Sequence, residues 1–539
     1  MTNLSEQESR RLEIQGKIDS SKSRVERNRL GQFSTPLELS IDMLRFAQIS
    51  VPEEKSIRFL DPAFGTGAFY SALLSVFPSH QIETAVGYEI DPEYAQAART
   101  IWRDTGLKVL ATDFTKADFP ENDNQKFDLL ICNPPYVRHH HLLREEKIRL
   151  KRLMIQNAGV ELNGLSGLYC YFMCLSHMWL KKGGIAGWLV PGEFMDVNYG
   201  RELKGYLLDQ VSLMRIHRFD SDDLQFGDAL VSSAIVFFRN IGPRSNHKIT
   251  FTHGGSLLKP RSSRDIAIGT LRGMTKWSRF FLMTEGSPAS PRKQCTLSDF
   301  FEIKRGLATG ANRFFILTPE EISRYQIPKE FLKPILPSPR FLGVDEVKAD
   351  MVGNPNIDQR LFLLNCKIPE DSIKRKYPSL WEYLQSGEAR GIDKRYLCKN
   401  RYPWYVQENR PPAPLLCSYM GRHAQGRISP FRFILNYSKA TATNSYLLLY
   451  PKPNLSIQLN GKCNLLKAIW GALNEIPSET LEREGRVYGG GLHKLEPREL
   501  AHVPADKILA LLPNTLDRFG AAGHRDASHG DGLSDPCRS

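Results

Sequence analysis

The sequence has no apolar run long enough to cross a membrane. A transmembrane helix needs about 18 or more consecutive apolar residues, and the 539 residues contain no such stretch. The beginning, MTNLSEQESRRLEIQGK, is polar and lacks the apolar core of a signal peptide. These absences predict a protein of the cytoplasm with no membrane partner.

Cysteine is scarce and unpatterned, with nine residues scattered along the chain and no CxxC pair. An odd number without a framework predicts reduced thiols and excludes a small disulfide-stabilised scaffold. Cys170 and Cys174 stand one helical turn apart, but small core side chains explain that spacing better than a metal does. His139, His140 and His141 are consecutive, so they cannot all face one ion. The sequence therefore predicts no metal site.

Acidic residues are too few to balance the basic ones, and the net charge is +13 with a pI of about 9.2. The excess is concentrated between Lys374 and Lys439, where 13 basic residues stand against 4 acidic ones, a net of +9. Eleven Trp, Tyr and Phe residues are interleaved there, more than a solvated charged face needs. A basic segment with many rings indicates a polyanionic partner, most simply nucleic acid.

No internal repeat of fixed period is present, and the chain divides by composition instead. Residues 1–30 predict a basic and polar helical arm. Residues 31–242 alternate short apolar runs with helical stretches, which is the βα pattern of a parallel sheet in an α/β domain. The polar segment 241–248 predicts a linker, residues 249–512 a separate α+β domain, and residues 513–539 a disordered tail.

The first domain has seven predicted strands and four predicted helices. The strands are residues 57–61, 84–90, 107–112, 127–132, 185–190, 213–219 and 231–238. The helices are residues 68–77, 92–103, 168–181 and 199–210.

The segment FLDPAFGTGAF, residues 59–69, resembles two phosphate-binding motifs, the dinucleotide fingerprint and the P-loop, but completes neither of them. Gly65 and Gly67 allow a tight turn between a strand and a helix, with close approach to a ligand. The dinucleotide fingerprint requires a third glycine where Tyr70 stands, and no lysine follows to form a P-loop. Asp61 ends the strand instead, where a carboxylate repels a pyrophosphate but suits a cationic ligand.

Acidic residues also follow the next two predicted strands. Glu89 in GYEIDP stands 28 residues after Asp61, where it can accept hydrogen bonds from ribose hydroxyls. Asp113 in ATDF can accept a hydrogen bond from an adenine amino group, with Phe114 beside the ring. Turns at strand ends favour acidic residues too, so one alone would carry little weight. The succession predicts a site for a nucleoside with a positive centre, as in S-adenosylmethionine.

The loop Asn-Pro-Pro-Tyr, residues 133–136, follows the apolar strand FDLLIC. Prolines remove backbone donors and fix the direction of the chain, so the loop holds its amide and its ring in set positions. The Asn133 side-chain oxygen and the Pro134 carbonyl can accept both N–H hydrogens of an exocyclic amine on a base. This would free the lone pair of the nitrogen through a preorganised acceptor pair. Tyr136 can stack on the same base.

GQFSTP, residues 31–36, precedes a helical pattern that Ser34 or Thr35 is placed to cap. Taken in order, GQFSTP, DPAFGTGAF, GYEIDP, ATDF and NPPY resemble the N6-adenine-specific DNA methyltransferases of type II restriction-modification systems, in the arrangement of their gamma group. The resemblance covers residues 31–240. It implies a Rossmann-like S-adenosylmethionine-dependent methyltransferase domain, followed by a target-recognition domain.

The resemblance also implies roles for single residues. Asn133 and Pro134 would contact the target amine of an extruded adenine, Tyr136 would stack on it, and Phe226 in DLQFGDALVSSAIVFF would help to hold it. The implied cofactor residues are Thr35, Asp61, Gly65, Gly67, Glu89, Asp113 and Phe114. The implied partners are double-stranded DNA in a bacterial nucleoid and a separately encoded restriction endonuclease. Because an asymmetric recognition domain can read a site unaided, we expect a monomer.

The second domain contains RGLATGANRFFIL, SYMGRHAQGRISPFRF, ATATNSYLLLY and REGRVYGGGLHKLEPREL, which resemble the recognition domains of the same group. Arginine reads guanine, and Asn or Gln reads adenine, whereas lysine mostly meets phosphate. Arg422, Gln425 and Arg427 are therefore the candidates for base contacts.

Other functions share part of this pattern. Glutamine methyltransferases of release factors share Asn-Pro-Pro-Tyr but are much shorter, and adenine methylation in RNA needs the same chemistry. A fused restriction-methylation enzyme requires a nuclease site, for which the only hint is Glu346-Val347-Lys348. A non-catalytic DNA-binding protein would not require an intact Asn133 and acidic trio.

Overall fold

The computed structural model describes residues 4–23, 26–27, 30–219, 233–282, 295–423, 429–488 and 491–512. The chain forms two compact units. The first comprises Met1–Ser287 and Val487–Gly491, and the second comprises Pro288–Arg486 and Leu492–Ser539. Among the described residues, no helix has both the length and the apolar character that crossing a bilayer requires.

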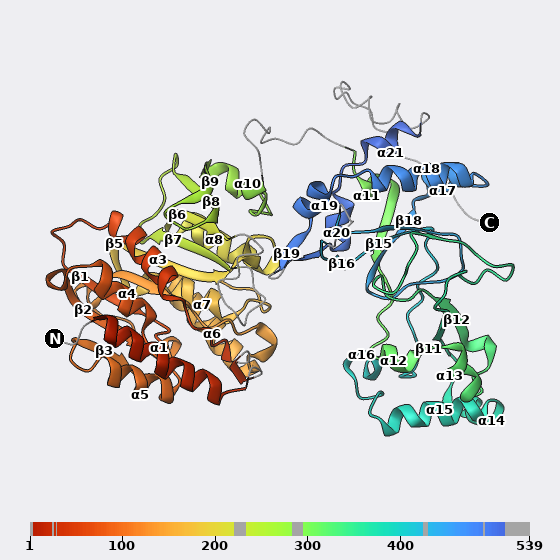
Figure 1. Cartoon of the computed structure of the whole chain (residues 1–539), viewed down its shortest axis with the longest axis horizontal. Coiled ribbons are helices and arrows are strands. Elements are labelled where there is room, and N and C mark those ends of the chain that lie inside the picture. The colour runs from red at the N-terminus through yellow and green to blue at the C-terminus, as the bar shows by residue number, and fades with distance from the viewer. Residues whose placement is uncertain are drawn as a thin grey trace, which may run out of the picture. The chain divides into compact units, whose positions relative to one another are not determined.

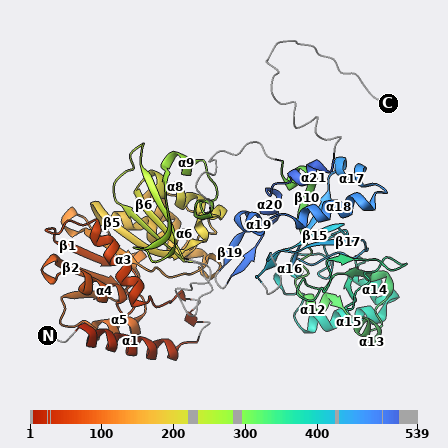
Figure 2. The ribbon, with the colours of Figure 1, turned by 45° about the horizontal axis from the view of Figure 1, so that its top comes forward.

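The first unit is built around one nine-stranded sheet (Figures 1 and 2). Its strands are β1 (Ile57–Asp61), β2 (Ile82–Tyr88), β3 (Leu107–Leu110), β4 (Phe127–Cys132), β5 (Leu180–Pro191), β6 (Ser212–Arg218), β7 (Ser233–Arg239), β8 (Lys248–Gly255) and β9 (Pro260–Ala267). The order across the sheet is β3-β2-β1-β4-β5-β7-β6-β8-β9. The first five strands in this order are parallel, and β7 is antiparallel to both of its neighbours.

Helices cover both faces of this sheet. They are α1 (Leu4–Ser21), α3 (Leu37–Ile49), α4 (Ala68–Val76), α5 (Pro92–Ile101), α6 (Arg144–Ala158), α7 (Leu168–Leu175), α8 (Arg201–Asp209), α9 (Ile268–Arg272) and α10 (Arg279–Leu282). Side chains of α3, α4 and α5 pack in one core cluster, and those of α6, α7 and α8 pack in another.

Strand β4 shows why the central strands are largely apolar. All six of its residues are buried. Leu129 and Ile131 lie in the cluster with α3 and α4, whereas Leu130 and Cys132 lie in the cluster with α6 and α7. Successive side chains of a strand point to opposite faces, so a strand covered on both faces is mostly apolar, and the one charged residue of β4, Asp128, is buried in ion pairs with two lysines. The predicted α/β class is therefore confirmed.

Each predicted strand of the first domain overlaps one of β1–β7, but the predicted domain boundary is too early. Segment 241–248 was expected to be a linker. Instead, β8 begins at Lys248 and pairs in parallel with β6, and β9 pairs with β8. Ile249 and Phe251 of β8 are buried in the core of the first unit. The Gly and Pro residues before β8 therefore mark a connection within one sheet.

Helix α6 was not predicted from the sequence. It buries only Leu150, Met154 and Ala158, each four residues after the previous one, while the rest of REEKIRLKRLMIQNA faces outward or is half-buried. Such a narrow apolar stripe carries a weak periodic signal.

The second unit combines helices with small sheets, as its predicted α+β class requires. Its strands are β10 (Phe301–Arg305), β11 (Ile316–Leu317), β12 (Leu332–Ile335), β13 (Glu346–Val347), β14 (Leu361–Leu364), β15 (Leu415–Ser418), β16 (Met420–Gly421), β17 (Phe433–Asn436), β18 (Tyr446–Pro451) and β20 (Leu492–Lys494). Strand β19 (Arg486–Tyr488) begins at the last residue of this part of the unit and continues past its boundary. Strands β10-β18-β15-β17-β13 form one sheet, β11-β14-β12 form another, and β16 pairs with β20.

The helices of the second unit are short. They are α11 (Leu297–Phe300), α12 (Asn312–Phe315), α13 (Pro319–Arg324), α14 (Glu370–Lys376), α15 (Pro378–Ala389), α16 (Tyr396–Lys399), α17 (Pro453–Leu459), α18 (Cys463–Asn474), α19 (Ser478–Glu484), α20 (Pro497–Ala501) and α21 (Asp506–Ala510).

Two glycines of the first unit give opposite expectations for the same substitution. A Cβ at Gly87 of β2 would lie 2.2 Å from the ring of Phe64, which is 3% exposed. We expect Gly87→Ala to lower the free energy of unfolding by about 1–3 kcal/mol, because a packed core does not admit an extra methyl group. Gly205 of α8 has open space around it, so Gly205→Ala should raise that free energy by about 0.5–1 kcal/mol through helix propensity. Urea titration of the transition of the first unit measures both, and equal effects would contradict this packing.

Candidate active site

The candidate site lies where the sheet order reverses between β1 and β4. Strand β1 pairs with β2 on one side and β4 on the other, so the chain leaves their carboxyl ends in opposite directions. Ligands of open α/β sheets bind at such a switch point. Asp61 ends β1, Glu89 follows β2 and Asn133 follows β4, so the topology brings these three predicted residues to one edge of the sheet.

Asp61 is a buried carboxyl group that is incompletely satisfied. Its side chain is 1% exposed, and Oδ1 accepts a hydrogen bond of 3.1 Å from the backbone N–H of Ala63. Burial, and then the nearby charge of Glu89, raise the pKa of Asp61 to about 8. The thiol of Cys132 is a weak donor beside it, and Oδ2 receives no strong hydrogen bond from the described residues. A cationic ligand would satisfy this group.

Glu89 connects, through hydrogen bonds, the loop that contains Gly65 and Gly67 (the glycine loop) to the loop after β2. Its Oε2 accepts from the backbone N–H of Gly65, and its Oε1 accepts from that of Asp91, each at 2.8 Å. Burial raises the pKa of Glu89, whereas these two backbone hydrogen bonds oppose the rise. Each oxygen retains a second lone pair, so the carboxylate can still accept from a ligand hydroxyl.

The glycine loop is also held by the N-terminal helix, which the sequence analysis did not anticipate. The Thr66 hydroxyl accepts a hydrogen bond of 3.2 Å from Arg11 and donates one of 2.6 Å to Gln15. Arg11 is 1% exposed and pairs with Glu8. The predicted arm is therefore packed on the loop between Gly65 and Gly67, both at positive φ. The available signal was the spacing of Arg11 and Gln15, one helical turn apart.

Asn133 is held by its amide nitrogen alone. Its Nδ2 donates to the backbone carbonyl of Phe33 and to the hydroxyl of Thr35, both at 3.1 Å. Because both partners are hydrogen-bond acceptors, the atom that faces them must be the amide nitrogen, which donates, and the other atom must be the oxygen. Its Oδ1 is buried and accepts no hydrogen bond from any described residue. The arrangement leaves one oriented acceptor available for a donor that arrives with a ligand.

The GQFSTP segment packs directly on the Asn-Pro-Pro-Tyr loop. The backbone N–H of Tyr136 donates to the carbonyl of Gly31 at 3.3 Å. A Cβ at Gly31 would lie 2.3 Å from the Tyr136 nitrogen, and φ is 68°, so only glycine fits here. The Tyr136 hydroxyl donates to the Leu189 carbonyl at 3.1 Å, and its ring lies 5.7 Å from that of Phe33. Tyr136 is therefore fixed at its backbone and at its hydroxyl.

The predicted capping of α3 by Ser34 or Thr35 is wrong. Pro36 is the N-cap residue of this helix and provides no side-chain hydrogen bond. Ser34 is exposed, and the Thr35 hydroxyl is engaged by Asn133. The proline sets the extended entry to the helix by its own backbone geometry, which frees Thr35 for the loop.

Asp113 and Phe114 have local structural roles. Asp113 Oδ1 accepts from the backbone N–H and the hydroxyl of Thr115, at 2.9 and 2.8 Å, and so caps a short turn. The Phe114 ring is 3% exposed and lies 5.1 Å from Trp179 and 5.5 Å from Tyr88. Their contact with a cofactor stays a prediction.

The structure describes only part of the predicted DNA-contacting set. Arg422 lies just after β16, whereas Phe226, Gln425 and Arg427 fall outside the described residues. The rings interleaved with basic residues between 374 and 439 mostly build the core rather than a stacking surface. Those that are buried are Tyr383, Trp404, Tyr405, Tyr419, Phe431 and Phe433. Tyr396 and Tyr402 are the large exposed rings of this segment, at 75% and 98%.

Known proteins resemble both units of the chain. The family model of the Eco57I restriction-modification methylase matches residues 81–226, and that of the C-terminal domain of the type II methyltransferase M.Eco57I matches residues 275–520. The type II methyltransferase M.AccI of Acinetobacter calcoaceticus is 28% identical over 489 residues, which are 88% of this chain and 85% of that protein. M.XamI of Xanthomonas campestris pv. amaranthicola is 26% identical over 88% of this chain and 84% of its own.

A solved structure shares the fold over most of the chain. The type IIL restriction-modification enzyme MmeI, solved in complex with DNA, has a TM-score of 0.50 and 14% identity over 91% of this chain and 75% of its own. At that identity the likeness concerns the fold alone. The family models and the relatives match across both units, so the chain is similar to the type II methyltransferases of restriction-modification systems, and these matches support site-specific DNA methylation with S-adenosylmethionine as cofactor.

Proposed function

We propose that this enzyme transfers the methyl group to the N6 amine of adenine within a short sequence of duplex DNA. The observation that carries the proposal is the buried Oδ1 of Asn133, which is oriented by two hydrogen bonds on Nδ2 and has no partner among the described residues. S-adenosylmethionine, when bound, supplies an electrophilic methyl group on a sulfonium. The protein must supply a nitrogen that can attack it.

The exocyclic amine of adenine is a poor nucleophile because its lone pair is delocalised into the ring. Asn133 Oδ1 and the carbonyl of Pro134 would accept its two N–H hydrogens and favour a more tetrahedral nitrogen. Pro134 is buried, and its ring limits the movement of its own backbone. Acceptors that are already in place need no reorganisation during the reaction, which is how a preorganised site lowers a barrier.

The target base must leave the duplex before these acceptors can reach its amine. Extrusion costs a few kcal/mol, and stacking on one aromatic ring returns about 1–3 kcal/mol. One ring therefore does not suffice, and the hydrogen bonds to Asn133 and Pro134 must contribute as well. We propose Tyr136 as one stacking ring, with Phe226 as the second.

The cofactor would lie at the carboxyl ends of the strands, next to Asp61 and Glu89. Asp61 fits a cationic group because its carboxyl is buried and incompletely hydrogen-bonded. Glu89 fits ribose hydroxyls because each of its oxygens accepts one backbone hydrogen bond and retains a second lone pair. The remaining proposed cofactor residues are Gly65, Gly67, Asp113 and Phe114, whereas Thr35, which was also predicted to contact the cofactor, is proposed to hold the Asn133 amide.

The second unit would select the DNA sequence, with Arg422, Gln425 and Arg427 as candidate base contacts. The biological role would be protection of DNA in the bacterial cytoplasm from a separately encoded endonuclease, by a monomeric enzyme associated with the nucleoid. A fused nuclease has little support in the second unit. Glu346, the one acidic residue of its candidate motif, forms an ion pair of 3.0 Å with Lys467.

The proposed function is tested with purified protein, labelled S-adenosylmethionine and plasmid DNA, followed by digestion to nucleosides. Label in N6-methyladenine supports the proposal. Label in N4-methylcytosine would show that the enzyme methylates cytosine instead of adenine. Label in RNA or protein substrates rather than DNA would show that the substrate class is wrong.

Asn133→Ala should lower the rate of methyl transfer by roughly 10²–10³-fold or more, because it removes a preorganised acceptor. Cofactor affinity, measured by calorimetry, should stay close to that of the wild type. Asn157→Ala on α6 is a matched control, since its amide donates to the carbonyl of Leu153 within the same helix. A loss of cofactor binding in Asn133→Ala would show that the assigned role is mistaken.

Thr35→Val separates two roles for Thr35. The hydroxyl accepts the Asn133 amide, so its removal should lower turnover by loosening that amide while cofactor affinity is retained. The sequence analysis placed Thr35 among the cofactor residues, in which case the dissociation constant of the cofactor would rise instead. Parallel measurements of turnover and of cofactor binding distinguish these outcomes.

Asp61 should couple cofactor binding to proton release. Its pKa of about 8 leaves it protonated in the free protein at neutral pH, and a cationic ligand must lower that pKa. Binding at pH near 7 should therefore release about one proton, and affinity should rise as the pH increases toward 8 and then level off. Calorimetry in buffers of different ionisation enthalpy measures the release. Asp61→Asn should release fewer protons, whereas Asp104→Asn, at an exposed position, should match the wild type. Equal release in all three proteins would refute the coupling.

A further inference from the structure

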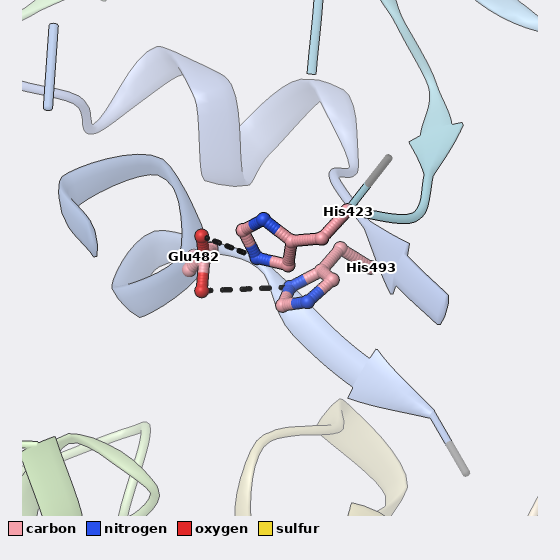
Figure 3. Close-up of side chains that lie close together, drawn as sticks. All are labelled: His423, Glu482 and His493. Carbon is pink, nitrogen blue, oxygen red and sulfur yellow. Dashed lines mark ion pairs between the residues drawn. The ribbon is translucent and has the colours of Figure 1, made fainter. Parts of the chain in front are cut away.

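Three side chains from distant parts of the sequence converge in the second unit (Figure 3). They are His423 after β16, Glu482 in α19 and His493 in β20. Their ligand atoms, one nitrogen from each histidine and a carboxylate oxygen, all lie within 4.8 Å of one another. These residues take no part in the candidate active site, and the sequence analysis predicted no metal site.

The carboxylate of Glu482 lies beside the two neighbouring imidazole rings, with one oxygen facing each ring, as Figure 3 shows. His423 Nε2 is 3.2 Å from Oε1, and His493 Nδ1 is 3.8 Å from Oε2. Ligands at about 2.0–2.2 Å from a tetrahedral zinc ion are about 3.3–3.5 Å apart. The two nitrogen–oxygen separations, each to a different carboxylate oxygen, lie on either side of that value. One ligand atom from each residue lies within 4.8 Å of the others, so side-chain rotations that shorten the longer separations would place all three around a single ion.

The donor set suits a borderline-soft divalent ion. Two imidazole nitrogens and one carboxylate are a known zinc set, with a fourth position left for water or another ligand. Magnesium and calcium prefer oxygen donors and would bind these nitrogens poorly. The Ser478 hydroxyl donates to Glu482 Oε1 at 2.5 Å, and such a hydrogen bond orients a ligating carboxylate.

The fold fixes part of this arrangement before any ion binds. Strands β16 and β20 are antiparallel, with Gly421 opposite His493, so His423 follows two residues after that pair. The His493 side chain is 6% exposed and that of Glu482 is 22% exposed, whereas that of His423 is 53% exposed. Glu482 and His493 are thus largely buried within the unit, whereas His423 lies at its surface.

We propose that His423, Glu482 and His493 form a binding site for one zinc ion, which ties β16, β20 and α19 together. His423 stands next to Arg422 in the sequence, so the ion would also anchor the chain that carries a candidate base contact. The site is independent of which base the enzyme methylates. The rival interpretation of the same geometry is a histidine–carboxylate hydrogen-bond cluster that takes no metal.

The test uses the full chain, free of affinity tags and stripped with a chelator, and titrates it with zinc chloride by calorimetry. The wild type should bind one equivalent, and His423→Ala and Glu482→Gln should lose it. His502→Ala, at an exposed histidine of the same unit, should retain it. Because the His423 side chain is half exposed, its replacement is the one least able to disturb folding. Magnesium chloride should give no saturable binding.

Two further measurements identify the ligands. X-ray absorption at the zinc edge should show nitrogen and oxygen neighbours with imidazole scattering, and zinc should raise the melting temperature of the wild type but not that of His423→Ala. Absence of stoichiometric binding in the wild type, equal binding in the His423 and Glu482 variants, or sulfur among the neighbours would each overturn the proposal.

Discussion

The Asn133 amide is held by two acceptors that come from about a hundred residues upstream, the Phe33 carbonyl and the Thr35 hydroxyl. The same upstream segment accepts the Tyr136 amide at Gly31, where any side chain would collide with the backbone of the loop. This docking fixes the oxygen as the end of the amide that remains without a partner among the described residues. If the amide were reversed, it would present a donor to the target amine, which has hydrogens to give and needs an acceptor. Under the proposed function, methyl transfer to an amine would therefore depend on this contact between GQFSTP and Asn-Pro-Pro-Tyr.

A second constraint is electrostatic. Asp61 and Glu89 lie close together at the edge of the sheet, and burial raises the pKa of both carboxyl groups. Two buried acids without a cation are costly when ionised, and the protein avoids that cost by keeping Asp61 protonated at neutral pH. If Asp61 holds the cofactor as proposed, the positive charge of that cofactor would remove the need for this proton. The glycine loop that bears on Glu89 is in turn held by Arg11 and Gln15 of α1, so the N-terminal helix supports the same edge.

The second unit shows how composition can mislead. Its basic segment contains many rings, which suggests a surface for stacking on DNA, but most of those rings are buried among one another. Tyr383, for example, stacks on Phe314 at 4.7 Å and donates its hydroxyl to the Phe314 carbonyl. Large side chains fill the core clusters of this unit between its short helices and small sheets. The positive charge of this segment still favours DNA as the partner, whereas most of its aromatic rings belong to the packed core.

The sequence by itself determined the α/β sheet, the order of the motifs along it and the identity of Asp61, Glu89 and Asn133. Those features are local, because short apolar runs, glycine turns and proline loops are written in consecutive residues. Only the tertiary structure decided which groups meet across long separations. The Thr35 hydroxyl contacts Asn133 rather than capping α3, Arg11 reaches Thr66, β8 and β9 extend the first sheet, and His423 meets Glu482 and His493. Such contacts depend on how distant segments pack in three dimensions, and no local pattern in the chain encodes that packing.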